Sequence, residues 1–185
     1  MRGSSTNRWL CMLAVIALGS SLGSPVLAAD PAGPLAPAAE GKVQCFGYDR
    51  ARKTCQSIAA YSAGPGDTVL NTASLLIARE PPIVMTTVSP VTIEGQRVCG
   101  PVRPEDLAAA TFTVSGAPAP PEAAQALAQG LNRAMKDMLG KRVCVIFEPD
   151  GAGFIAHATL DSLPQPDSDQ HLIWVAPNDG YTVAP

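Results

Sequence analysis

Four cysteines constrain the fold of this chain more than any other feature. Cys45, Cys55, Cys99 and Cys144 all follow an N-terminal stretch typical of an export signal, so we expect folding in an oxidising compartment. The successive spacings are 10, 44 and 45 residues, with no Cys-x-x-Cys. Zinc sites and thioredoxin-like centres usually bring cysteines in close pairs, so the spacing favours two structural disulfides and no bound metal.

Residues 1–28 are expected to be a signal peptide. Two arginines precede the apolar run Leu10–Leu18, and small residues before the expected cleavage after Ala28 suit signal peptidase. The apolar run is too short to cross a bilayer core of about 30 Å. We therefore predict a periplasmic or secreted protein without a transmembrane span after cleavage. The Ala- and Pro-rich composition favours a bacterial source with a high-GC genome.

Sequence position favours one disulfide pairing among the three that four cysteines allow. Cys45 and Cys55 flank a charged turn and are expected to join the two arms of a hairpin. Cys99 and Cys144 lie on strand-like runs that are expected to be neighbours in a sheet. The loop-entropy model assigns these two disulfides roughly 3 and 4 kcal/mol, a large share of a typical domain's stability.

The remaining pattern predicts an α+β domain over residues 42–185. Residues 29–41 are rich in Pro and Ala and are expected to form a flexible tether. Runs of β-branched and apolar residues predict about six to eight strands in a mainly antiparallel sheet, with Ser89-Pro90 separating two of them. One substantial helix, residues 121–139, has an apolar stripe and Gly140 as its C-cap. We expect this helix to pack on one sheet face.

Charge and motifs exclude several classes of function. After loss of the two signal-peptide arginines, 11 Lys and Arg remain against 16 Asp and Glu, a net charge near −5. Such a chain lacks the basic surface that nucleic-acid binding requires. It also lacks a Walker A motif, a dinucleotide fingerprint and an EF-hand loop, so no cofactor is predicted.

Catalytic candidates are few. The two histidines, His157 and His171, lie on strand-like runs, and a His157–Asp161 pair is the best candidate for acid–base chemistry. Paired carboxylates are a second possibility. The candidates for such a pair are Glu94, Glu148, Asp150 and Asp161. A small envelope hydrolase built on these groups is therefore the alternative to a non-catalytic function.

The most distinctive local feature is a basic hairpin tip, held out by the Cys45–Cys55 bridge. Its candidate binding residues are Tyr48, Arg50, Arg52 and Lys53. Because a rigid loop loses little entropy on binding, we predict an interaction module with an envelope or secreted protein partner, such as an accessory protein or an inhibitor. A further alternative is a carrier that holds a small apolar ligand between helix and sheet, with Met135 and Met138 in the pocket.

Overall fold

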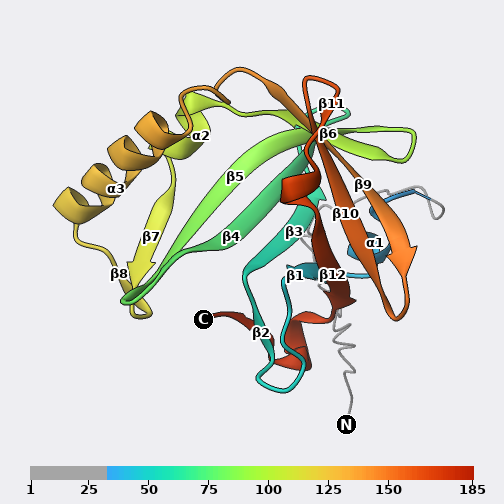
Figure 1. The fold of residues 1–185 in the computed structure, drawn as a ribbon, viewed down its shortest axis with the longest axis horizontal. Helices are drawn as coiled ribbons and strands as arrows, with labels where there is room; N and C mark the ends of the chain where they lie inside the picture. The colour runs from blue at the N-terminus through green and yellow to red at the C-terminus, as the bar shows by residue number, and fades with distance from the viewer. Residues whose placement is uncertain (1–32) are drawn as a thin grey trace, which may run out of the picture.

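The computed structural model describes residues 33–185, which form a closed eight-stranded antiparallel β-barrel (Figure 1). Going round the ring, the strand order is β4-β3-β1-β12-β10-β9-β6-β5, and pairing of β5 with β4 closes it. The barrel strands are β1 (Val43–Phe46), β3 (Ser57–Ala63), β4 (Val69–Arg79), β5 (Pro82–Glu94), β6 (Arg97–Pro101), β9 (Arg142–Asp150), β10 (Gly153–Leu160) and β12 (Gln170–Val175).

Short elements surround this ring. Five short strands are β2 (Thr54–Cys55), β7 (Thr111–Val114), β8 (Ala117–Pro118), β11 (Leu163–Pro164) and β13 (Thr182–Val183). The helices are α1 (Ala36–Ala39), α2 (Pro104–Ala108) and α3 (Pro121–Ala134), with 3₁₀ turns η1 (Pro166–Ser168) and η2 (Pro177–Asp179). Strands β7 and β8 extend the sheet outward from β5, beyond the ring.

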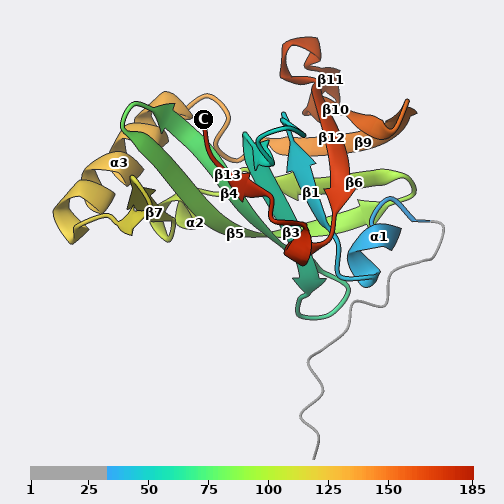
Figure 2. The same ribbon diagram turned by 90° about the horizontal axis from the view of Figure 1, so that it is seen from below.

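The predicted α+β fold, with one main helix on a sheet face, is wrong. The sheet curls until β4 and β5 pair, so its inner face is enclosed by the barrel itself and needs no helix to cover it. Figures 1 and 2 both place α3 outside the ring, beside α2 and β7. No residue of α3 is fully buried, and the helix ends at Ala134 rather than at Leu139.

Strand β5 is also longer than predicted. It runs unbroken through Ser89 and Pro90, which the sequence suggested as a break between two strands. On its second side, β5 pairs with β7 up to Thr86 and with β6 from Thr92 onward. Pro90 therefore lies in a stretch that pairs on one side only, where a residue without an N–H is tolerated.

One end of the barrel is closed by helix α1. Leu35, just before the helix, is 0% exposed and clusters with Ala38, Val69 and Val98. Inward-facing aromatic side chains from three other strands pack against this cluster, namely Tyr61, Phe147 and Trp174. The folded domain thus begins before Lys42, and the described part of the expected tether, residues 33–41, is packed structure.

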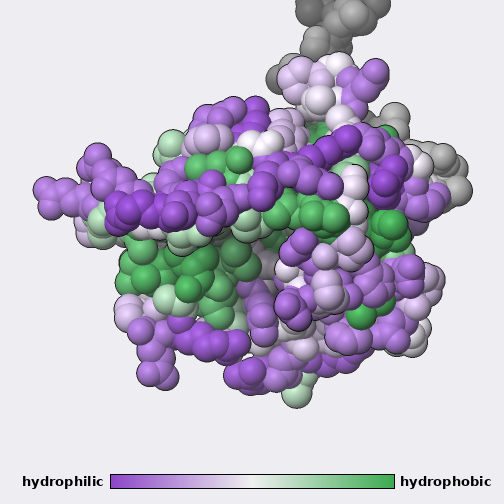
Figure 3. Space-filling model, turned by 45° about the horizontal axis from the view of Figure 1, so that its top comes forward, coloured by the Kyte–Doolittle hydropathy of each residue, from purple (hydrophilic) through white to green (hydrophobic). Residues whose placement is uncertain are grey.

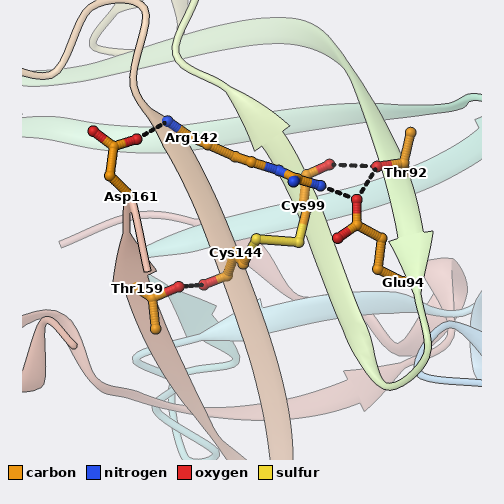
Figure 4. Close-up of a disulfide and its surroundings, with 7 residues drawn as sticks. All are labelled: Thr92, Glu94, Cys99, Arg142, Cys144, Thr159 and Asp161. Carbon is orange, nitrogen blue, oxygen red and sulfur yellow. Dashed lines mark hydrogen bonds and ion pairs between the residues drawn. A yellow bond between two sulfur atoms is a disulfide. The ribbon is translucent and has the colours of Figure 1, made fainter. Parts of the chain in front are cut away.

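Both disulfides have the pairing that the sequence favoured. Cys99 of β6 lies directly opposite Cys144 of β9, with Cα atoms 4.1 Å apart (Figure 4). Near the bridge, the Arg142 guanidinium of β9 forms an ion pair with Glu94 of β5. The Arg142 backbone N–H donates to Asp161 at 2.9 Å. The disulfide therefore links two neighbouring strands of the barrel, β6 and β9.

The Cys45–Cys55 bridge belongs to a second small core on the outside of the barrel. It joins β1 to β2, with Cα atoms 5.4 Å apart, and packs with Ile173 and Val175. Strand β13, close to the C-terminus, pairs in parallel with β2. The hairpin predicted for this region is present, because β1 pairs antiparallel with β3.

The export-signal prediction, residues 1–28, lies outside the described residues. Two disulfides within residues 33–185 fit a protein that folds in an oxidising environment. Across these same residues, none of the helices has the length and apolar character needed to cross a bilayer.

Candidate ligand-binding cavity

The barrel interior contains a cavity of about 720 Å³. It exists because many inward-facing positions carry side chains too small to fill the ring. These positions are Ser57, Ala59, Ala73, Ser89, Gly100, Ala156 and Ala158. An eight-stranded barrel is wide enough either to be filled by large side chains or to hold one small ligand, and small residues leave the second option open. The volume lies within the usual range of ligand pockets, about 300–1,000 Å³.

Most of the cavity wall is apolar. Val91, Val98, Val145 and Phe147 line it from β5, β6 and β9. Apolar residues also reach the surface of the molecule, as the green areas in the left half of Figure 3 show. The interior therefore suits a ligand whose surface is mainly hydrocarbon.

Residues from α3 and from the turn after it line the end of the cavity that lies away from α1. Leu131, Met135 and Met138 are the contributing side chains. Met138 is 37% exposed, and Leu75, which also lines the cavity from β4, is 39% exposed. Flexible methionine side chains adapt to ligands of different shape. These residues form an apolar mouth opposite the end closed by α1.

A polar group lies near the closed end. The Tyr61 hydroxyl lines the cavity and donates to the Gln44 side-chain oxygen at 2.8 Å. Burial raises the pKa of Tyr61 far above its usual value, although a hydrogen bond from Asn71 acts in the opposite direction. Gln44 is 0% exposed, and its amide nitrogen has no partner within residues 33–185. Because buried polar atoms are normally hydrogen-bonded, this unpaired amide is unusual.

One ion pair also lines the cavity. Arg103 and Asp106, from the start of α2, are the charged residues in the cavity wall, and Asp106 is only 7% exposed. The Arg103 guanidinium donates to both carboxylate oxygens of Asp106, with Nε 3.0 Å from Oδ2. Burial pushes the pKa of Asp106 upward, but hydrogen bonds from Arg103 and Ser89 outweigh it and lower that pKa overall.

The predicted binding residues at the hairpin tip lie outside this cavity and are held by the rest of the chain. Arg52 Nε donates to Asp49 at 2.9 Å, and Arg52 Nη1 donates to the backbone oxygen of Pro185 at 3.0 Å. Lys53 Nζ donates to the Asp179 backbone oxygen at 2.8 Å. The Arg50 guanidinium lies 5.0 Å from the centre of the Tyr48 ring. The tip therefore makes ordered contacts with the C-terminal segment.

The predicted catalytic histidine and its aspartate are not brought together as a pair. Nδ1 of His157 lies 2.7 Å from Asp169, whereas Asp161 accepts the Arg142 backbone N–H. His171 lies 2.9 Å from Asp150.

Three of the acidic candidates contact a basic side chain or a histidine. Glu94 pairs with Arg142, Glu148 lies 3.6 Å from His157, and Asp150 contacts His171. None of these carboxylates lines the cavity. Within residues 33–185, no group of three or more His, Cys, Asp or Glu side chains is arranged to hold a metal ion.

Sequence reasoning identified two of the cavity residues, Met135 and Met138, but missed the polar group formed by Gln44, Tyr61 and Asn71. The available signal was weak: Asn71 alternates with the apolar Val69 and Ala73, and Gln44 shares a strand face with Phe46. No protein-family model, curated protein or solved structure matches this chain.

Proposed function

We propose that this is an exported, non-catalytic binding protein that holds one small, mainly apolar molecule inside its barrel. The observation that carries the proposal is the cavity of about 720 Å³, which small inward-facing residues leave open and apolar side chains line. Enclosing hydrocarbon in such a space is favourable by about 25 cal/mol for each Å² removed from water. A periplasmic or secreted location is part of the proposal and is supported by the disulfides.

A binding function fits the distribution of reactive groups better than hydrolysis does. The titratable residues in the cavity wall, Tyr61 aside, are Arg103 and Asp106, and these two are tied to each other. The histidines and paired carboxylates contact one another outside the cavity. A protein partner at the hairpin tip has less support, because Arg52 and Lys53 already bind the C-terminal segment.

The test is binding of the neutral fluorescent probe N-phenyl-1-naphthylamine, whose emission rises in apolar surroundings. Ala73 lines the cavity from β4, so Ala73→Phe fills part of the space and is expected to weaken probe binding at least about tenfold. Ser62→Phe adds the same ring to an exposed, outward-facing position on β3 and is expected to leave binding unchanged.

A second cavity-filling variant shows whether weaker probe binding by Ala73→Phe comes from a local folding defect at that residue. Ala158 lines the cavity from β10, which lies across the ring from β4, so Ala158→Leu approaches the same space from the opposite wall. Equal probe affinity in both filling variants and in the wild type, with unchanged circular dichroism, would place the probe elsewhere and contradict the proposal. Absence of probe binding by the wild type would contradict it too.

A further inference from the structure

The charge balance of the cavity wall restricts which apolar molecules it can hold. Arg103 would be the natural partner of a carboxylate or phosphate, but Asp106 already accepts hydrogen bonds from two of its guanidinium nitrogens. One cation and one anion cancel, so the wall offers no net charge to a charged ligand. Burying an uncompensated charge is strongly unfavourable.

One group of polar side chains in the wall lies on the neighbouring strands β3, β4 and β5, whereas other polar residues, such as Gln165 and Gln170, line the cavity from β12 and the segment before it. Tyr61 of β3 lies opposite Asn71 of β4, and Asn71 lies opposite Ser89 of β5, so three hydrogen-bonding side chains face the cavity in a row. Behind Tyr61, the fully buried Gln44 amide has a polar atom without a partner in the described chain. At the opposite end, the mouth is lined by Leu131, Met135 and Met138.

We propose that the ligand is an uncharged amphiphile with a hydrocarbon tail and one hydroxyl or comparable neutral polar end, bound with that end inward beside Tyr61 and Asn71. A hydroxyl both donates and accepts, so it satisfies the amide and phenol groups in whichever orientation they take. The tail then lies along the apolar wall toward the methionines at the mouth. This inference rests on the proposed function and specifies the chemical class that the same cavity selects.

The test compares three molecules that share a twelve-carbon chain: 1-dodecanol, dodecanoate and dodecane. Each is titrated against the bound N-phenyl-1-naphthylamine probe at pH 8, where the acid is ionised. We expect dodecanol to displace the probe at concentrations at least about tenfold lower than either of the others, because only the alcohol pairs the polar group without burying a charge.

Two variants and one control test the two parts of the inference, the polar end and the absence of charge. Asn71→Leu removes one polar partner and is expected to reduce the preference for alcohol over alkane, whereas Thr72→Val, on the outward face of the same strand, is expected to keep it. Asp106→Asn removes the carboxylate that accepts two hydrogen bonds from Arg103 and leaves it the longer contact with Glu105 at 3.6 Å, so it is expected to improve dodecanoate binding about tenfold relative to dodecanol.

The outcomes separate this inference from the proposed function. If the probe binds in the cavity but dodecanoate displaces it as well as dodecanol does, the ligand class is wrong while the binding function stands. If dodecane displaces the probe at the same concentration as dodecanol does, the proposed inward polar end is wrong. If the probe does not bind at all, the proposed function fails, and this inference fails with it.

Discussion

Leu35 and helix α1, which close one end of the barrel, provide the most direct test of the structure. Leu35 lies in a stretch that composition alone suggests is a flexible tether, yet it is 0% exposed and packs among inward-facing residues of several strands. Leu35→Ala removes three carbon groups, worth about 2.4 kcal/mol at about 0.8 kcal/mol each. A residual cavity adds to this loss, so we expect destabilisation of roughly 3 kcal/mol.

For a domain of this size, 1 kcal/mol corresponds to about 2–4 °C, so the melting temperature should fall by roughly 6–12 °C. Trp174 provides a local reading of the same event, since it packs against the Leu35 cluster and is the sole tryptophan after residue 28. The emission of Trp174 in folded Leu35→Ala should shift because the leucine side chain no longer fills the space beside the indole ring.

The matched control is Glu40→Ala, which alters an exposed side chain at the end of the same helix, paired with Lys42 at 2.8 Å. Surface changes of this kind are usually within about 0.5 kcal/mol of neutral. Thermal and urea unfolding of the oxidised proteins, followed by circular dichroism, provide the comparison. If Leu35→Ala melts within 2 °C of Glu40→Ala, roughly the scatter of surface changes, α1 does not close the barrel and the reasoning is refuted.

Three further predictions concern bonds and backbone elsewhere in the fold. Replacing Cys99 and Cys144 together by Ala should destabilise the protein by up to about 4 kcal/mol in urea unfolding, and a non-reducing peptide map of the wild type should recover the Cys99–Cys144 link. Because the folded-state pKa of Asp106 is lowered, its contribution to stability is present above about pH 4 and is lost as pH falls through the folded pKa. Asp106→Asn should therefore lose less stability than the wild type when thermal melts are recorded at falling pH. The same pH dependence of the melting temperature in both proteins would show that Asp106 is not its source. Gly153→Ala places a Cβ 2.5 Å from the Leu172 backbone oxygen and should destabilise by about 1–3 kcal/mol, whereas Gly130→Ala in α3 meets nothing within 4 Å and should stabilise by up to about 1 kcal/mol.

Local features were predictable from the sequence where short-range chemistry determines them. A run rich in Val, Leu, Ile and Thr over residues 68–79 predicts a strand, and β4 occupies Val69–Arg79. The agreement is close because these residues and the flanking Gly and Pro act locally. The disulfide pairing followed from the positions of the cysteines on neighbouring strands. The strand and the Cys45–Cys55 bridge depend on residues close in sequence, whereas the Cys99–Cys144 bridge joins strands whose cysteines are 45 residues apart.

Closure of the sheet was not predictable in the same way. It depends on the pairing of β1 with β12 and of β4 with β5, and an alternating pattern in a strand is the same in an open sheet and in a barrel. The amphipathic pattern of α3 predicted a helix but not where its apolar side would lie, and that side borders the cavity through Leu131. Cavity residues such as Ala73 and Ala158 carry no chemical signal of their own, since their role is to leave space.

The order of strands in the ring has a consequence for how the chain reaches its folded state. β1, at Val43–Phe46, lies between β3 and β12, and its second partner arrives only with Gln170–Val175 near the other end of the sequence. The barrel therefore cannot close before residues 170–175 have been synthesised and are free to pair with β1. Folds dominated by such distant pairings form slowly. A chain with this topology has an open sheet until β12 is available, and its cavity forms only when β12 pairs with β1.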